Sequence, residues 1–214
     1  MAMSMVISGL DDARRHQSDR QTNNQHARAI RIGGSYGVFL DTVLWKDILV
    51  GDILVLKSEE ELPADLVPLA CSGAAGQCYV STANLDGETN LKIKSCAGLA
   101  QNYLCKEDHE DGPPLLDQAI ERLPSINGLL HIEAPSKSIN KFSGSVELKD
   151  EANQESLSAA NLLLRGTQLR NTAWLFGVVV YTGPHTRMAM NSREIPTKQA
   201  NLEQVVNRAM LVVL

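Results

Sequence analysis

Four consecutive residues near the middle of the chain, Asp86-Gly87-Glu88-Thr89, combine groups that can take part in catalysis. The glycine has no Cβ, so its backbone can approach another surface closely. A carboxylate on such a loop can orient an attacking water or accept its proton, and a neighbouring hydroxyl can hydrogen-bond a phosphoryl oxygen. Asp-Gly is also a common turn dipeptide, so the stretch is consistent with a plain chain reversal as well.

The other reactive side chains show no spacing typical of a catalytic or metal site. No H-E-x-x-H, G-x-S-x-G, P-loop or G-x-G-x-x-G is present, and we expect no bound metal. We expect surface or structural histidines at His16, His26, His109, His131 and His185. We expect reduced thiols, partly in the core, at Cys71, Cys78, Cys96 and Cys105, with metal or redox roles as the alternatives.

The composition is that of an ordinary globular protein with a mildly acidic balance. Of the 214 residues, 43% are hydrophobic and 21% charged, and 20 Lys and Arg face 25 Asp and Glu. No basic stripe is visible, so nucleic acid is not an expected partner. The longest apolar run, 174–181, has the length of a strand, whereas a membrane span needs ~18 apolar residues or more.

Hydrophobic periodicity predicts a β-rich body between two helices. Apolar residues at helical spacing predict a helix over about 1–24 and another toward the C-terminus. Between them we expect a hairpin around Gly33-Gly34-Ser35 and a helical insertion at about 95–127, with an exposed loop at 106–114. Further strands are expected in WKDILVGDILVLK, DLVPLAC, QCYVSTANL, GLLHIEA, KFSGSVELK, ANLLLRG and NTAWLFGVVVYTG. This pattern favours a sandwich, jelly roll or distorted barrel.

From end to end, the chain resembles the actuator domain of type IV P-type ATPases, the phospholipid flippases. The DGET form distinguishes it from ion-pumping relatives, which usually carry Thr-Gly-Glu-Ser at this place. The resemblance implies a mainly β fold, a distorted jelly roll or double-stranded β-helix with flanking helices. The stretches that carry it are DARRHQSDRQTNN (12–24), WKDILVGDILVL (45–56), Pro63-Ala64-Asp65, CYVSTANLDGETNLK (78–92), APSKSINKFSG (134–144), LLLRGTQLRNT (162–172) and VVVYTGPHTRMAMN (178–191).

The resemblance also implies a reaction for the four-residue loop. In this family an aspartate of a separate domain is transiently phosphorylated, and the actuator loop then positions the water that hydrolyses the aspartyl phosphate. Glu88 is then the catalytic carboxylate, and Gly87 permits close approach to the phosphate. Asp86 and Thr89 support the loop or contact the phosphate site. Phosphoryl transfer depends on positioning and charge stabilisation, so a residue that orients water is sufficient.

Three cations are candidates for contacts with another domain of the pump. Lys92 is one, with a solvated lysine as the alternative. Arg165 and Arg170 are the others, with a salt-bridged surface as the alternative. Asp65 is expected to fix a turn or to accept hydrogen bonds from backbone amides. Two positions depart from the flippase pattern, Ser136 where Asn is common and His185 where an acidic residue is frequent.

The domain organisation implied by the resemblance is a membrane-proximal stub at 1–26, the actuator body at 27–190 and a C-terminal helix at 191–214. No D-K-T-G motif is present, so we expect the phosphorylation and nucleotide-binding domains to be partners from the same pump, at the cytosolic face of a membrane. We expect no cofactor on this chain, and ATP and Mg²⁺ to be needed by the whole pump. Phospholipid and an accessory membrane β-subunit are expected partners through membrane helices. The alternatives are a cation-pump actuator and a stand-alone β-rich binding module.

Overall fold

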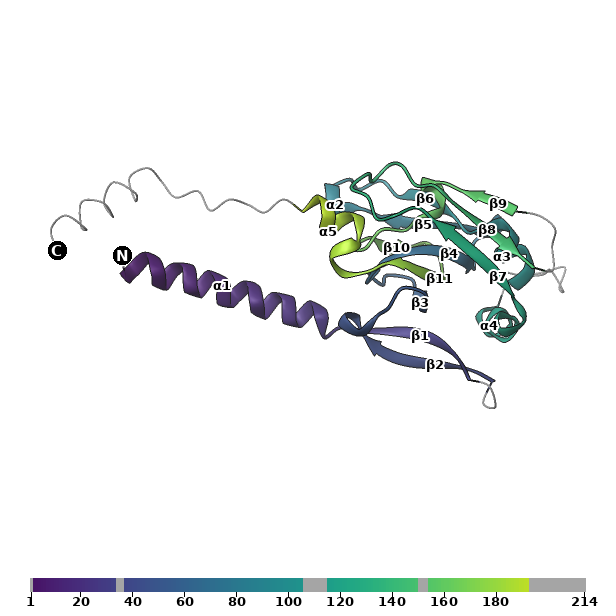
Figure 1. Ribbon diagram of the computed structural model, residues 1–214, viewed down its shortest axis with the longest axis horizontal. Coiled ribbons are helices and arrows are strands. Elements are labelled where there is room, and N and C mark those ends of the chain that lie inside the picture. Colours follow the sequence, from purple (N-terminus) through teal and green to yellow (C-terminus); the bar gives the residue numbers. More distant parts are fainter. Residues whose placement is uncertain (1, 34–36, 106–114, 150–153, 193–214) are drawn as a thin grey trace. The chain divides into compact units, whose positions relative to one another are not determined.

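The computed structural model describes residues 2–33, 37–105, 115–149 and 154–192 (Figure 1). Helix α1 (Ala2–Asn23) confirms the helix expected over 1–24. Residues 25–191 form one compact unit, and α1 belongs to a second one. Within the described ranges, no helix is both long and apolar enough to cross a membrane. The helix expected at the C-terminus lies, from residue 193 on, outside the described residues.

A five-stranded antiparallel sheet is the central layer of the unit formed by residues 25–191. The predicted hairpin is confirmed, because its two strands pair along their length from His26↔Leu44 to Gly33↔Gly37. The last strand that the structure describes, β11, lies between β3 and β4. The order across the sheet is β2 (Gly37–Leu44), β1 (His26–Gly33), β3 (Ile53–Lys57), β11 (Trp174–Tyr181) and β4 (Asp65–Cys71).

Alternating side chains of β3 and β11 enter two separate hydrophobic clusters, one on each face of this sheet. Val55 and Phe176 belong to the first cluster, whereas Leu54 and Leu175 belong to the second. Neighbouring side chains of a strand point to opposite faces, so strands buried on both faces read as continuous apolar runs. This explains why ILVLK and WLFGVVVY look uniformly hydrophobic in the sequence.

Two three-stranded antiparallel sheets cover the two faces. The first cluster takes in residues of β8, β9 and the insertion helices, and the second takes in residues of β5 and β10. One covering sheet has the order β7 (Gly128–Ile132), β8 (Gly144–Leu148), β9 (Gln154–Leu157). The other has the order β10 (Gln168–Arg170), β5 (Gln77–Ser81), β6 (Lys92–Ser95). Together the three sheets confirm the mainly β fold.

The insertion expected at about 95–127 is helical, as predicted. It contains α3 (Gly98–Leu104), α4 (Leu116–Arg122) and a 3₁₀ turn, η3 (Leu123–Ser125). Their buried side chains, among them Leu104, Ile120 and Leu123, join the first cluster. The polar loop expected at 106–114 lies outside the described residues. The remaining short elements are η1 (Trp45–Asp47), η2 (Ala74–Gly76), α2 (Ala83–Asp86), η5 (Gly183–His185) and α5 (Arg187–Asn191).

The first apolar run of WKDILVGDILVLK is not a strand, because it begins with the 3₁₀ turn η1 and β3 starts only at Ile53. The strand predicted in ANLLLRG is also wrong. Its first residues form the 3₁₀ turn η4 (Ala159–Asn161), and only an isolated bridge between Leu66 and Leu163 remains of strand pairing. Ser158 and Asn161 form a reciprocal capping box, which supplies partners for backbone amides without a sheet ladder. Leu162, Leu163 and Leu164 are buried although they lie in a loop. Their hydrophobic character therefore indicated burial and did not indicate strand pairing.

Candidate functional site

The Asp86–Thr89 stretch lies in the connection between β5 and β6. After β5 the chain forms α2, a single helical turn whose amides at Leu85 and Asp86 donate to the Thr82 carbonyl oxygen at 2.8 and 3.0 Å. Gly87 ends this turn with φ +75° in the left-handed region, and its amide donates to the Ala83 carbonyl oxygen at 3.1 Å. Glycine adopts this conformation without a Cβ penalty. The helical turn therefore ends before Glu88, which lies outside helix and strand.

Asp86 fixes the start of the loop. Its Oδ1 accepts the backbone amide of Glu88 at 3.0 Å, which is the local Asx pattern that closes turns. Its Oδ2 accepts Lys92 Nζ at 2.7 Å. The same ammonium lies 3.1 Å from Glu88 Oε2. Lys92 therefore bridges the two carboxylates of the loop. This contact was not among the expectations for Lys92, which were a contact with another domain or a solvated side chain.

The charges of this cluster shift the pKa of two of its members. The hydrogen bond from Lys92, followed by the one from the Glu88 amide, lowers the pKa of Asp86 from its ordinary 3.8 to about 2. In return, Asp86 and then Glu88 raise the pKa of Lys92 above its ordinary value. Both shifts favour the charged forms, so Asp86 and Lys92 are ionised together at neutral pH.

We expect Asp86 to titrate with a pKa of about 2 and the Lys92→Met variant to return it toward 3.8, because the largest lowering contact is removed. The pKa is depressed in the folded state, so the stability it gives is present above pH ~4 and is lost as pH falls through ~2. Carboxyl NMR chemical shifts between pH 1.5 and 6 measure this. An unchanged Asp86 pKa in Lys92→Met would show that the pair does not form in solution.

Glu88 has the most exposed side chain of this cluster. The exposed fraction of its side chain is 60%, against 38% for Asp86 and 40% for Lys92. Thr89 follows it on the same exposed loop. Because the Glu88 carboxylate is exposed, it can contact a water and an electrophile that another domain supplies. The exposed loop is therefore suited to orienting a water that attacks a group on another domain, and less suited to forming a complete active site by itself.

Of the two arginines singled out in the sequence, Arg165 lies next to a residue that packs on α2, and Arg170 lies on β10. Gly166, which follows Arg165, has φ +83° and approaches α2 so closely that a Cβ there would stand 3.0 Å from Leu85 Cδ2. Arg170 lies on β10, opposite Tyr79 of β5, and forms an ion pair with Glu59. The salt-bridged alternative therefore describes Arg170. A domain contact by Arg165 or Arg170 stays a prediction.

Asp65 is completely buried and accepts two backbone amides, as expected from its place in Pro-Ala-Asp. Its Oδ1 accepts Arg165 N and its Oδ2 accepts Arg187 N, both at 2.8 Å. Burial raises the pKa of this carboxyl above its ordinary value, although the two amides and then the charges of Arg187 and Arg165 oppose that shift. Asp65 thus joins the turn that packs on α2 to the first residue of α5.

Sequence reasoning missed Arg187, the largest completely buried side chain. One of its terminal nitrogens lies 2.5 Å from Glu133 Oε1, and the guanidinium stands over the rings of Phe142 and Tyr181 at 5.6 and 5.7 Å. It also donates to the Ser136 hydroxyl and to the carbonyl oxygens of Ser138 and Lys141. No local signal marks this arginine, because the hydrogen-bond partners of its guanidinium lie 46 to 54 residues earlier in the chain.

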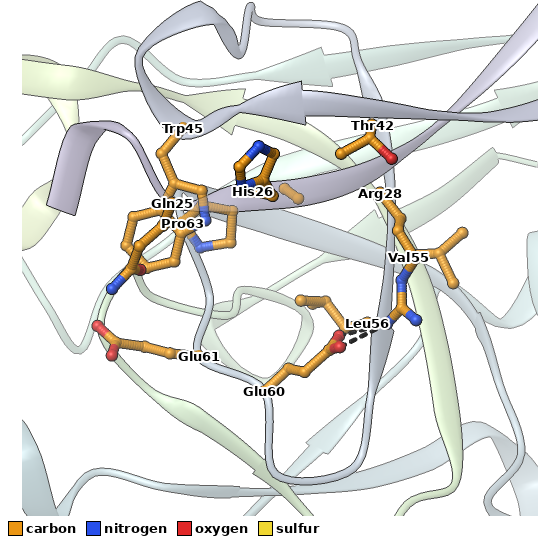
Figure 2. Close-up of a pocket in the computed structure, with 11 residues that line it drawn as sticks. Gln25, His26, Arg28, Thr42, Trp45, Val55, Leu56, Glu60, Glu61 and Pro63 are labelled. Atoms are coloured by element: carbon orange, nitrogen blue, oxygen red, sulfur yellow. Dashed lines mark hydrogen bonds and ion pairs between the residues drawn. The ribbon is translucent and has the colours of Figure 1, made fainter. Parts of the chain in front are cut away.

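A separate hollow of about 550 Å³ lies where β1, β2 and β3 meet the segment after β3 (Figure 2). Arg28 crosses it to both carboxylate oxygens of Glu60, at 2.6 and 2.5 Å. None of the residues Asp86–Thr89 lines this hollow. Among the described residues, no group of three or more His, Cys, Asp or Glu side chains could hold a metal ion. The hollow therefore contributes no side chain to the candidate site at Asp86–Thr89.

No family model matches the chain, but individual relatives match nearly all of it. It is 36% identical over 211 residues to the phospholipid-transporting ATPase DRS2 of Saccharomyces cerevisiae, covering 99% of the chain and 14% of that protein. It is 33% identical to the probable phospholipid-transporting ATPase IM of Homo sapiens over 99% of the chain. It is 37% identical to the probable phospholipid-transporting ATPase 12 of Arabidopsis thaliana over 96% of the chain. The chain covers 16% of the length of the human protein and 16% of the length of the Arabidopsis protein.

Proposed function

We propose that this chain, which belongs to the family of type IV phospholipid-transporting ATPases, is the actuator domain of a phospholipid-translocating pump. Its loop Asp86-Gly87-Glu88-Thr89 promotes hydrolysis of an aspartyl phosphate carried by another domain of the same pump. Glu88 orients the attacking water and takes up its proton. Movement of the domain during this step drives the membrane helices through which the lipid passes.

The observation that carries this proposal is the presentation of Glu88. The side chain stands exposed directly after the left-handed Gly87, while Asp86 holds the backbone of the loop through the Glu88 amide. A rigid turn with a projecting carboxylate can enter a phosphate site on a second domain and fix a water in line with the phosphorus–oxygen bond. The similarity of nearly the whole chain to a part of phospholipid-transporting ATPases supports this class of pump.

The remaining parts of the reaction belong to the other domains of the pump. The chain spans 14–16% of the relatives it matches. Under this proposal the phosphorylated aspartate, the ATP site and Mg²⁺ are supplied by the phosphorylation and nucleotide-binding domains. The lipid pathway and the contact with an accessory β-subunit belong to membrane helices. The domain itself works at the cytosolic face and binds no cofactor.

The test uses the complete parent protein in lipid vesicles and radiolabelled ATP. We expect a phosphoenzyme that is labile to hydroxylamine and whose decay is accelerated by an added phospholipid but not by changes of Na⁺, K⁺ or Ca²⁺. Acceleration by a cation and not by lipid would assign the domain to a cation pump. The absence of any ATP-dependent phosphoenzyme would favour a binding module without catalytic function.

A further inference from the structure

We infer that Lys92 is a positioning residue for Glu88, holding its carboxylate beside Asp86 at the place from which it enters the phosphate site. This inference rests on the proposed function of the loop. It assigns Lys92 an action through Glu88, instead of the contact with a separate domain expected from the sequence.

The two ends of the Lys92 bridge are held by regular structure. Lys92 is the first residue of β6, and its backbone is paired opposite Val80 of β5. Asp86 is the last residue of α2, and its carboxylate is held by the amide of Glu88 and by Lys92 Nζ. Glu88 lies between them in a segment without helix or strand. Its side chain is tied to the sheet through Lys92 Nζ at 3.1 Å.

The charges of the three groups favour this arrangement. Asp86 and Glu88 are two carboxylates on one short turn, and they repel each other unless a cation lies between them. The Lys92 ammonium has three donors on a flexible stem, so it can contact both oxygens at once. With Lys92 removed, Glu88 loses its ionic partner while the negative charge of Asp86 stays. The carboxylate is then free to adopt other rotamers and to move away from Asp86.

This bridge affects the rate of the reaction much more than the stability of the fold. Exposed ion pairs contribute little to stability because both partners are well solvated when separated, and all three side chains are more than a third exposed. Catalysis by orientation is far more sensitive, since a displacement of ~1 Å can lower a rate by ~100-fold. A residue that sets the starting place of Glu88 is therefore detected in kinetics.

The experiment compares variants of the complete pump by phosphoenzyme formation and decay. Lys92→Met should slow decay by ~10- to 100-fold, with formation from ATP unchanged, and formation also reports that the variant is folded. Lys92→Arg should restore most of the decay rate because it keeps a cation that reaches both carboxylates. In a Glu88→Gln background, Lys92→Met should not slow the residual decay further. Lys57→Met, at an exposed lysine of β3, is the matched control and should behave as the wild type.

Three results would count against a part of this account, and they are distinguishable. Normal decay in Lys92→Met, with decay blocked in Glu88→Gln, would overturn the positioning role and leave the proposed function standing. Further slowing in the double variant would show that Lys92 acts on the phosphate or on another domain directly, which also overturns it. Normal decay in Glu88→Gln would overturn the proposed function itself.

Discussion

In the complete pump, replacing Glu88 by glutamine is expected to block decay of the phosphoenzyme while ATP-dependent phosphorylation continues. The amide has nearly the same shape but cannot accept a proton from water, and general-base contributions of this kind are worth ~100- to 10,000-fold in rate. The fold should be unaffected, because the Glu88 side chain is 60% exposed and its contact is an exposed ion pair. Phosphoenzyme should therefore accumulate under steady turnover. Quenched-flow decay after an ATP chase measures the effect.

The control for this variant is Glu147→Gln, at an exposed glutamate of β8 in the covering sheet that does not carry the loop. It makes the same chemical change in the same unit and should leave decay at the wild-type rate. Equal decay in Glu88→Gln and wild type would reduce the Asp86–Thr89 stretch to a plain turn. Loss of phosphorylation as well as decay would indicate misfolding or a role earlier in the cycle.

Replacing Arg187 by methionine is expected to lower the free energy of unfolding of the chain by about 3 kcal/mol. The completely buried guanidinium satisfies Glu133 and the carbonyl oxygens of Ser138 and Lys141. A methionine fills part of the volume but leaves these acceptors without their donor, and a buried acceptor without a partner costs about 1–3 kcal/mol. Glu133 is partly exposed, so water can solvate its carboxylate in the variant. The loss of stability is therefore expected at the lower end of the range of about 3–5 kcal/mol for a broken buried ion pair. Urea unfolding followed by tryptophan fluorescence measures the change.

Arg170→Met provides the matched control for that stability measurement. Arg170 also has an ionic partner, Glu59, but both side chains are more than a third exposed. Its replacement should therefore cost less than about 1 kcal/mol. If Arg170→Met and Arg187→Met lowered the free energy of unfolding equally, burial would not be what makes the Arg187 contacts important.

The parts of this fold that could be predicted from sequence are those with a local cause. The helix at 1–24 follows from apolar residues at helical spacing, and the hairpin at 26–44 from two apolar runs joined by glycines. The strand predicted in ANLLLRG failed because three buried leucines fit a loop as well as a strand. The strands β9 and β10 were missed because QESL and QLR are too short and polar to show a period.

In the candidate site, too, features with a local cause were predicted and contacts between distant residues were missed. The catalytic role of Glu88, inferred from Asp86-Gly87-Glu88-Thr89, stays a prediction, and the turn expected there is present with a left-handed Gly87. The bridge made by Lys92 was missed because it depends on the strand pairing that places Lys92 beside the end of α2. Arg187 was missed because its partners lie 46 to 54 residues away. No local pattern shows that an arginine in a polar stretch is buried against so distant a segment.

The central place of β11 also has a consequence for the order in which a newly made chain can fold. Among the described strands β11 comes last in the sequence, yet it separates β3 from β4. Asp65 at the start of β4 accepts the amides of residues 165 and 187, which also come late in the chain. Until residues 174–187 have left the ribosome, β3 and β4 lack the strand between them and Asp65 lacks the amide of Arg187. Unpaired strand edges are sites for pairing with other chains. A chain that ends before residue 174 would therefore keep these edges open to pairing with other chains, whereas a chain that has released α5 from the ribosome can complete the sheet.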